Sequence, residues 1–180
     1  MYKKMLVVVD DRVVTESAIR QSIEMAHALR ADIHFCYVLP SPAVMGFEFL
    51  PMAEQANDDL QNEAIVHAKN ILDAAVELAE QADILSFGVV ASGADGAQCV
   101  AEVAKKRHCD LIVVGTEETN AVLRILNGSI VPGLISRATV PVLVCREGSS
   151  GGSRRRATVS SRAKQRRLEL RDRRRREAND

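Results

Sequence analysis

Polar loops follow the first and the fourth apolar runs of the sequence. The first loop is Asp10-Asp11-Arg12, and the second begins at Gly115 and reaches Gly128-Ser129, where a helical pattern starts. A Gly-Ser helix start offers free backbone N–H groups to an anion. In open parallel sheets, ligands bind beyond the carboxyl ends of the strands, where the strand order reverses. The two loops therefore predict a phosphate-binding crevice. Asp10 has an alternative interpretation as a strand-end cap.

The sequence lacks the motifs that usually mark an enzyme. It contains no G-x-S-x-G elbow, and no Ser or Cys has an obvious His and acid partner. Neither G-x-x-x-x-G-K-[ST] nor G-x-G-x-x-G occurs. His34 and Cys36 share one face of a strand by alternation, as half of a metal site would, but nothing at ligand spacing completes it. We therefore expect these two residues to pack in the core, and we expect no catalytic residues and no metal centre.

Five short aliphatic runs alternate with helical patterns. The runs predict buried strands at Met5–Val9, Ile33–Leu39, Ile84–Val90, Leu111–Val114 and Val140–Cys145, each apolar on both faces. The helical patterns cover Thr15–Leu29, Asp58–Glu80, Gln98–Arg107 and the segment from Gly128 to Arg137. Strands that alternate with helices imply right-handed crossovers and a covered parallel sheet. We expect an α/β fold, a single doubly wound open parallel five-stranded sheet of order 3-2-1-4-5 with helices on both faces.

Composition marks the segments outside this alternation. Pro40–Ala56 holds three prolines and is predicted to be a long irregular loop, after which Asn57 would cap a helix. Residues 148–153 have the composition of a flexible Gly/Ser linker. We therefore expect a domain over residues 1–147, this linker, and an Arg-rich tail over residues 154–180 that is disordered on its own.

The formal net charge of zero hides two oppositely charged parts. Residues 1–150 contain 12 basic and 20 acidic side chains, whereas residues 151–180 contain 12 basic and 4 acidic ones. Such a basic tail is typical of a segment that contacts a polyanion or an acidic protein. The alternative is a solvated extension, or one that folds back onto the acidic part of the chain. No apolar run approaches the length of a membrane span, and residues 1–10 lack the features of a secretory signal, so we expect a cytoplasmic protein. The four separated cysteines are predicted to be reduced thiols.

Five pieces of the sequence, taken in order, resemble the universal stress protein family over residues 1 to about 146. They are Leu6-Val7-Val8-Val9-Asp10, Tyr37-Val38, Ala101-Glu102-Val103-Ala104 leading into Cys109 to Gly115, the Gly128-Ser129 turn, and Val140-Pro141-Val142-Leu143-Val144. Members of the family that bind ATP share the pattern Gly-x2-Gly-x9-Gly-Ser/Thr. Gly115, Gly128 and Ser129 match this pattern, but Glu118 occupies the position of its second glycine.

The resemblance implies a stress-response regulatory module that binds ATP, together with magnesium, in the crevice between strands one and four. By the same resemblance, adenine would be held by Asp10 and Val38, and ribose and phosphates by Gly115, Gly128 and Ser129. At most very slow ATP hydrolysis would follow. Glu118 would oppose a phosphate, because two like charges about 4 Å apart cost about 4 kcal/mol at an effective dielectric of about 20. ATP binding is therefore expected to be weak or lost.

A function of a different class is also open, that of an ATP-independent homodimeric adaptor. The last strand, Val140–Cys145, is an apolar edge strand in a 3-2-1-4-5 sheet, and an exposed edge invites pairing with a second chain. The resemblance implies that two such strands join antiparallel. In this function the basic tail would contact nucleic acid or an acidic partner.

Overall fold

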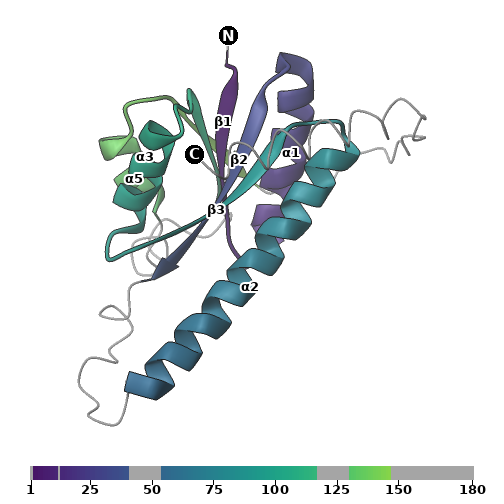
Figure 1. Cartoon of the computed structure of the whole chain (residues 1–180). Helices are drawn as coiled ribbons and strands as arrows, with labels where there is room; N and C mark the ends of the chain where they lie inside the picture. Colours follow the sequence, from purple (N-terminus) through teal and green to yellow (C-terminus); the bar gives the residue numbers. More distant parts are fainter. Residues whose placement is uncertain (1, 12, 41–53, 117–129, 147–180) are drawn as a thin grey trace.

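A computed structural model of the chain describes residues 2–11, 13–40, 54–116 and 130–146 (Figure 1). Within these residues, the centre of the molecule is a five-stranded sheet of order β3-β2-β1-β4-β5 in which all neighbouring strands are parallel. The strands are β1 (Lys4–Val9), β2 (Asp32–Pro40), β3 (Ser86–Gly93), β4 (Leu111–Thr116) and β5 (Val142–Arg146). The predicted fold class and strand order are confirmed.

Helices cover both faces of the sheet, as expected. Helices α1 (Val13–Leu29) and α2 (Glu54–Gln81) pack on one face, and α3 (Gly96–Lys106) and α5 (Val131–Arg137) pack on the other (Figure 1). Each face buries its own apolar core. On the first face Phe35 and Leu72 are buried, and on the second Ile112 and Leu134 are buried. The two cores fix the sheet between two helical layers.

Burial differs between the central and the outer strands. Every residue of β4 is buried, and so is every residue of β1 after Lys4. In contrast, β3 is mostly half-buried, and Val142, Leu143 and Val144 of β5 are also half-buried. The prediction that each strand is buried on both faces is therefore wrong for β3 and β5, because an edge strand has a neighbour on one side only.

Helix α2 begins earlier than the sequence analysis suggested. Its first residue is Glu54, so Asn57 lies inside the helix and its predicted role as a helix cap is wrong. Glu54, Gln55 and Ala56 all favour helical backbone, and neither proline nor glycine follows Pro51 before Asn57. Nothing in this stretch stops the helix at Asn57, and Figure 1 shows its first turns extending past the edge of the sheet.

The predicted linker (residues 148–153) and tail (residues 154–180) lie outside the described residues, so the predicted domain boundaries stay predictions. Among the helices that the structure describes, none is long and apolar enough to cross a membrane. The four cysteines are free thiols; Cys36, Cys109 and Cys145 are buried, and Cys99 is half-buried.

Candidate functional site

The parallel register brings three of the predicted site residues to the edge of the sheet that the carboxyl ends of the strands form. Asp10 directly follows β1, and Val38 is the first residue of β2 beyond the last β1–β2 pair. Gly115 is the first residue of β4 beyond its last pair with β1. The strand order reverses between β1 and β4, so the three residues lie where ligands bind in folds of this kind.

The other predicted phosphate contacts, Gly128 and Ser129, lie outside the described residues, as does Glu118. The chain is described again from Ile130, which lies near the same edge. A Cβ atom placed on Gly96 would lie 3.4 Å from Cγ2 of Ile130 and 3.7 Å from Cγ1 of Val38. The start of α3 and the residue before α5 therefore flank Val38, on the face of the sheet that α3 and α5 cover.

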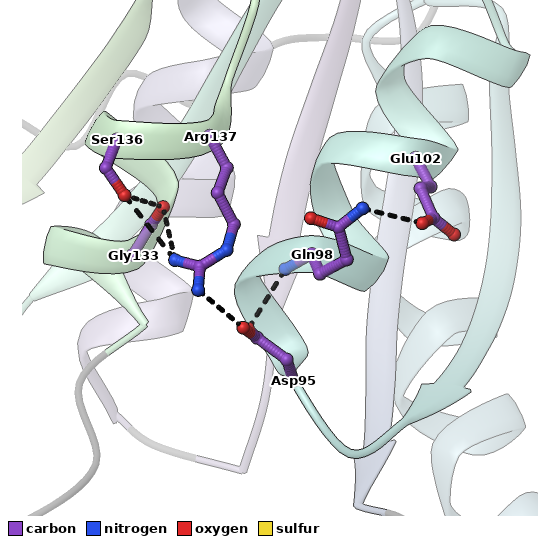
Figure 2. Close-up of polar contacts among 6 residues, drawn as sticks. All are labelled: Asp95, Gln98, Glu102, Gly133, Ser136 and Arg137. Atoms are coloured by element: carbon purple, nitrogen blue, oxygen red, sulfur yellow. Dashed lines mark hydrogen bonds and ion pairs between the residues drawn. The ribbon is translucent and has the colours of Figure 1, made fainter.

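A polar cluster ties α3 to α5 beside this edge (Figure 2). The carboxylate of Asp95 caps α3 by accepting a hydrogen bond from the backbone N–H of Gln98, at 3.1 Å. The same carboxylate pairs with the guanidinium of Arg137, whose Nη2 lies 2.9 Å away. Nη1 of Arg137 also donates to the carbonyl of Gly133. Both charged side chains are partly exposed, so the pair contributes about 0.5 kcal/mol and mainly fixes the orientation of α5.

The two helices also approach each other closely through small residues. A Cβ atom on Gly133 would lie only 2.7 Å from the Cβ of Ala97, a separation that real side chains do not adopt. Gly133 is therefore required for this helix contact. Sequence reasoning missed the whole cluster, because it began the helix at Gln98 and so passed over Asp95 as its cap.

A second polar group lies on the other face of the sheet, at the same edge. Oδ2 of Asp11 accepts a hydrogen bond from the Tyr37 hydroxyl at 3.0 Å, and Oδ1 of Asp11 lies 2.7 Å from Nε2 of His67. Burial, followed by the hydrogen bond to Asp11, raises the pKa of Tyr37 to about 12. The hydroxyl therefore stays protonated and keeps donating. The sequence analysis did not connect these residues, although Asp11 and Tyr37 were both expected at strand ends.

His34 lies in an apolar part of the core rather than in a binding site. It is 3% exposed, its ring stacks on Phe87 with centroids 4.9 Å apart, and neither ring nitrogen has a hydrogen-bond partner among the described residues. Burial lowers its pKa to about 4, with smaller effects from Lys4 and Arg107. Burial also raises the pKa of Cys36 to about 12, which disfavours the thiolate that a metal needs. Both residues pack in the core, as the sequence analysis favoured.

The sheet is doubly wound and parallel, and polar residues gather where its strand order reverses, which is where α/β proteins of this architecture bind their ligands. The model of the universal stress protein family matches residues 1–146. The chain belongs to this family, and the resemblance found in its motifs is confirmed.

Similar proteins span the same part of the chain. The universal stress protein YxiE of Bacillus subtilis is 25% identical over 151 residues, which cover 81% of this chain and all of YxiE. The solved structure of the universal stress protein UspA from Lactobacillus plantarum superposes with a TM-score of 0.67 at 23% identity, covering 81% of this chain and 98% of its own. A universal stress protein solved in complex with cAMP superposes with a TM-score of 0.61 at 21% identity, covering 80% and 97%. These structures share the fold of this chain.

Proposed function

We propose that this protein is a stress-response regulatory module that binds an adenine nucleotide, ATP with magnesium, between β1 and β4. The observation that carries the proposal is the position of Asp10, Val38 and Gly115 at one edge, where the strand order reverses. A structurally similar member of the family was solved in complex with cAMP, which supports an adenine nucleotide as the ligand.

In this proposal, Asp10 and Val38 hold the base. A carboxylate accepts hydrogen bonds from amino and hydroxyl groups, and backbone groups at the end of a strand supply a donor and an acceptor for a heterocycle. Gly115, Gly128 and Ser129 hold the ribose and the phosphates, because a backbone without side chains can approach an anion closely. The sequence shows no Ser or Cys with an obvious His and acid partner, so in this proposal ATP acts as a signal whose hydrolysis is very slow at most.

Glu118 determines how tightly the phosphates bind. A micromolar ligand has a binding free energy of about 8 kcal/mol, and one misplaced carboxylate beside a phosphate removes about half of it. The proposed site therefore binds ATP weakly in this chain.

Copurified nucleotide provides the first test. Protein purified gently from the cytoplasm is analysed by mass spectrometry under native conditions, and calorimetry with ATP and magnesium then measures the affinity. Binding of ATP that is weakened by Asp10→Ala supports the proposal. Protein that neither carries nor binds an adenine nucleotide contradicts it.

The second candidate function is an ATP-independent homodimeric adaptor, and the edge position of β5 favours it. Val142, Leu143 and Val144 stay half-buried in the single chain, so a second β5 strand would cover their remaining apolar surface. Pro141 removes one backbone donor just before the strand begins and leaves the rest of the edge free to pair. In this role, residues 154–180 contact a polyanion such as nucleic acid, or an acidic protein.

A further inference from the structure

Asp11 joins three separate elements at the candidate site. It lies in the connection between β1 and α1, its Oδ2 accepts from Tyr37 on β2, and its Oδ1 contacts His67 on α2. Tyr37 is 26 residues and His67 is 56 residues away along the chain. One carboxylate therefore anchors the turn after β1 to the strand beside it and to the helix above that strand.

The anchored turn contains Asp10, the residue proposed to contact the base. Asp10 immediately precedes Asp11, and its charge acts on Tyr37, because it contributes to the raised pKa of that hydroxyl. A loop residue that is already ordered loses less conformational entropy when a ligand binds. Anchoring Asp11 therefore prepares Asp10 for ligand binding.

We propose that Asp11, shared between Tyr37 and His67, is a positioning residue that holds Asp10 for recognition of an adenine base, and that proton uptake by His67 strengthens this hold. The inference rests on the proposed function, because it concerns the same site. It adds Tyr37 and His67 to the site, and it gives a specific role to Asp11, which the sequence analysis placed only in the loop beside the crevice.

The charges around His67 explain the dependence on protons. Within the described ranges, the ionisable groups around His67 include Asp10 and Asp11 after β1, Tyr37 on β2, and Glu63 one turn earlier on α2. The β3 residues that pair with Tyr37 and Val38 are Val90 and Ala91, and neither carries a charge. Asp11 and His67 form an ion pair only when the imidazole is protonated. Acidification therefore adds attraction between opposite charges to the contact of Asp11 with His67, whose imidazole is otherwise neutral.

The test measures binding of cAMP by calorimetry at a mildly acidic and a mildly alkaline pH. The single phosphodiester charge of cAMP stays constant over this range, so a change in affinity reports on the protein. The full chain is compared with Asp11→Asn, Tyr37→Phe and His67→Gln. The matched control is His27→Gln, because His27 is an exposed histidine in the last turn of α1, at the opposite edge of the sheet.

Each variant has a distinct expected result. The unaltered chain and His27→Gln bind cAMP about threefold more tightly at the acidic pH, as expected for an exposed ion pair. Asp11→Asn and His67→Gln lose this increase. Tyr37→Phe keeps the increase but binds about threefold more weakly at both pH values, because one hydrogen bond to Asp11 is gone. Circular dichroism and thermal unfolding show whether each variant is folded.

The possible failures can be told apart. If Asp11→Asn keeps the pH dependence, His67 acts only as a positive charge near the phosphate, and the positioning role of Asp11 is wrong. If all variants bind cAMP equally well, the positioning role fails and the proposed function stands. If the unaltered chain binds neither cAMP nor ATP at either pH, both fail.

Discussion

Replacement of His34 should make the fold less sensitive to acid. This imidazole is 3% exposed, and neither nitrogen has a hydrogen-bond partner among the described residues. Its pKa is lowered from 6.5 to about 4, chiefly by burial and further by the positive charges of Lys4 and Arg107. Because the folded state binds the proton less readily than the unfolded chain, acidification favours unfolding. The neutral ring is fully compatible with folding above pH 6.5, and stability is lost as the pH falls from 6.5 toward 4.

The size of this loss follows from the two pKa values. Each pKa unit corresponds to about 1.4 kcal/mol, so the shift of His34 amounts to about 3 kcal/mol once the pH is below the folded value. Between pH 7 and about pH 5, the same shift removes about 2 kcal/mol from the free energy of unfolding. A domain of this size has a total stability of about 5 to 15 kcal/mol, so the effect is measurable.

Urea unfolding at the two pH values measures this difference. His34→Leu replaces the ring by an apolar side chain suited to the surrounding core, and His34→Phe keeps an aromatic ring beside Phe87 in case leucine packs poorly. Both variants should lose about 2 kcal/mol less than the unaltered chain on acidification. The exposed His27→Gln is the control and should behave like the unaltered chain.

The refuting result is equally clear. If both His34 variants lose as much stability between the two pH values as the unaltered chain does, protonation of His34 does not contribute to acid unfolding. The imidazole would then have a hydrogen-bond partner, or water would reach it before the fold opens.

Four further predictions concern the contacts and segments described above. Glu118→Gly should tighten ATP binding and Gly128→Val should weaken it, as measured by calorimetry with magnesium, because the first removes a carboxylate from the proposed phosphate site and the second adds bulk to it; equal affinities would place the site elsewhere. A chain truncated after Glu147 should be a dimer through β5 in light scattering, and a monomer at micromolar concentration would contradict this. Gly133→Ala should destabilise the protein by about 1 to 3 kcal/mol in urea unfolding, because the new Cβ would lie 2.7 Å from that of Ala97. Addition of Ala97→Gly should restore part of this loss. A Gly133→Ala variant of unchanged stability would show that α3 and α5 can move apart freely. The full chain, but not the truncated one, should shift RNA in gels, and the shift should weaken steeply with salt; equal shifts or none from both would exclude nucleic acid as the partner of the tail.

The amino-acid sequence was sufficient to predict the sheet and the positions of three residues of the candidate site. Aliphatic runs alternating with helical patterns imply parallel strands, and local hydrophobic periodicity carries this information. Asp10, Val38 and Gly115 come at or near the ends of such runs, so the topology alone brings them to one edge. Glu118 could likewise be recognised as a departure from the pattern of the ATP-binding members, because that comparison needs only spacing along the chain.

Other features depend on contacts between residues that are distant in sequence. Asp11 and His67 are 56 residues apart, and Asp95 at the start of α3 forms an ion pair with Arg137 at the end of α5. Neither contact has a local pattern, since each depends on how a helix is rotated over the sheet. The early start of α2 was missed for a different reason, because Asn57 suits a helix cap locally while the preceding residues favour continuing the helix.

The burial of His34 shows most clearly what the tertiary structure decided. Strand alternation placed this residue on the same face as Cys36. Alternation alone does not tell whether a polar ring on that face contacts a ligand, water or apolar side chains. In the folded chain it stacks on Phe87 from the neighbouring strand and is 3% exposed. The electrostatic cost of its charge therefore comes from the packing of several elements, and packing is a property of the assembled fold rather than of any segment of the sequence.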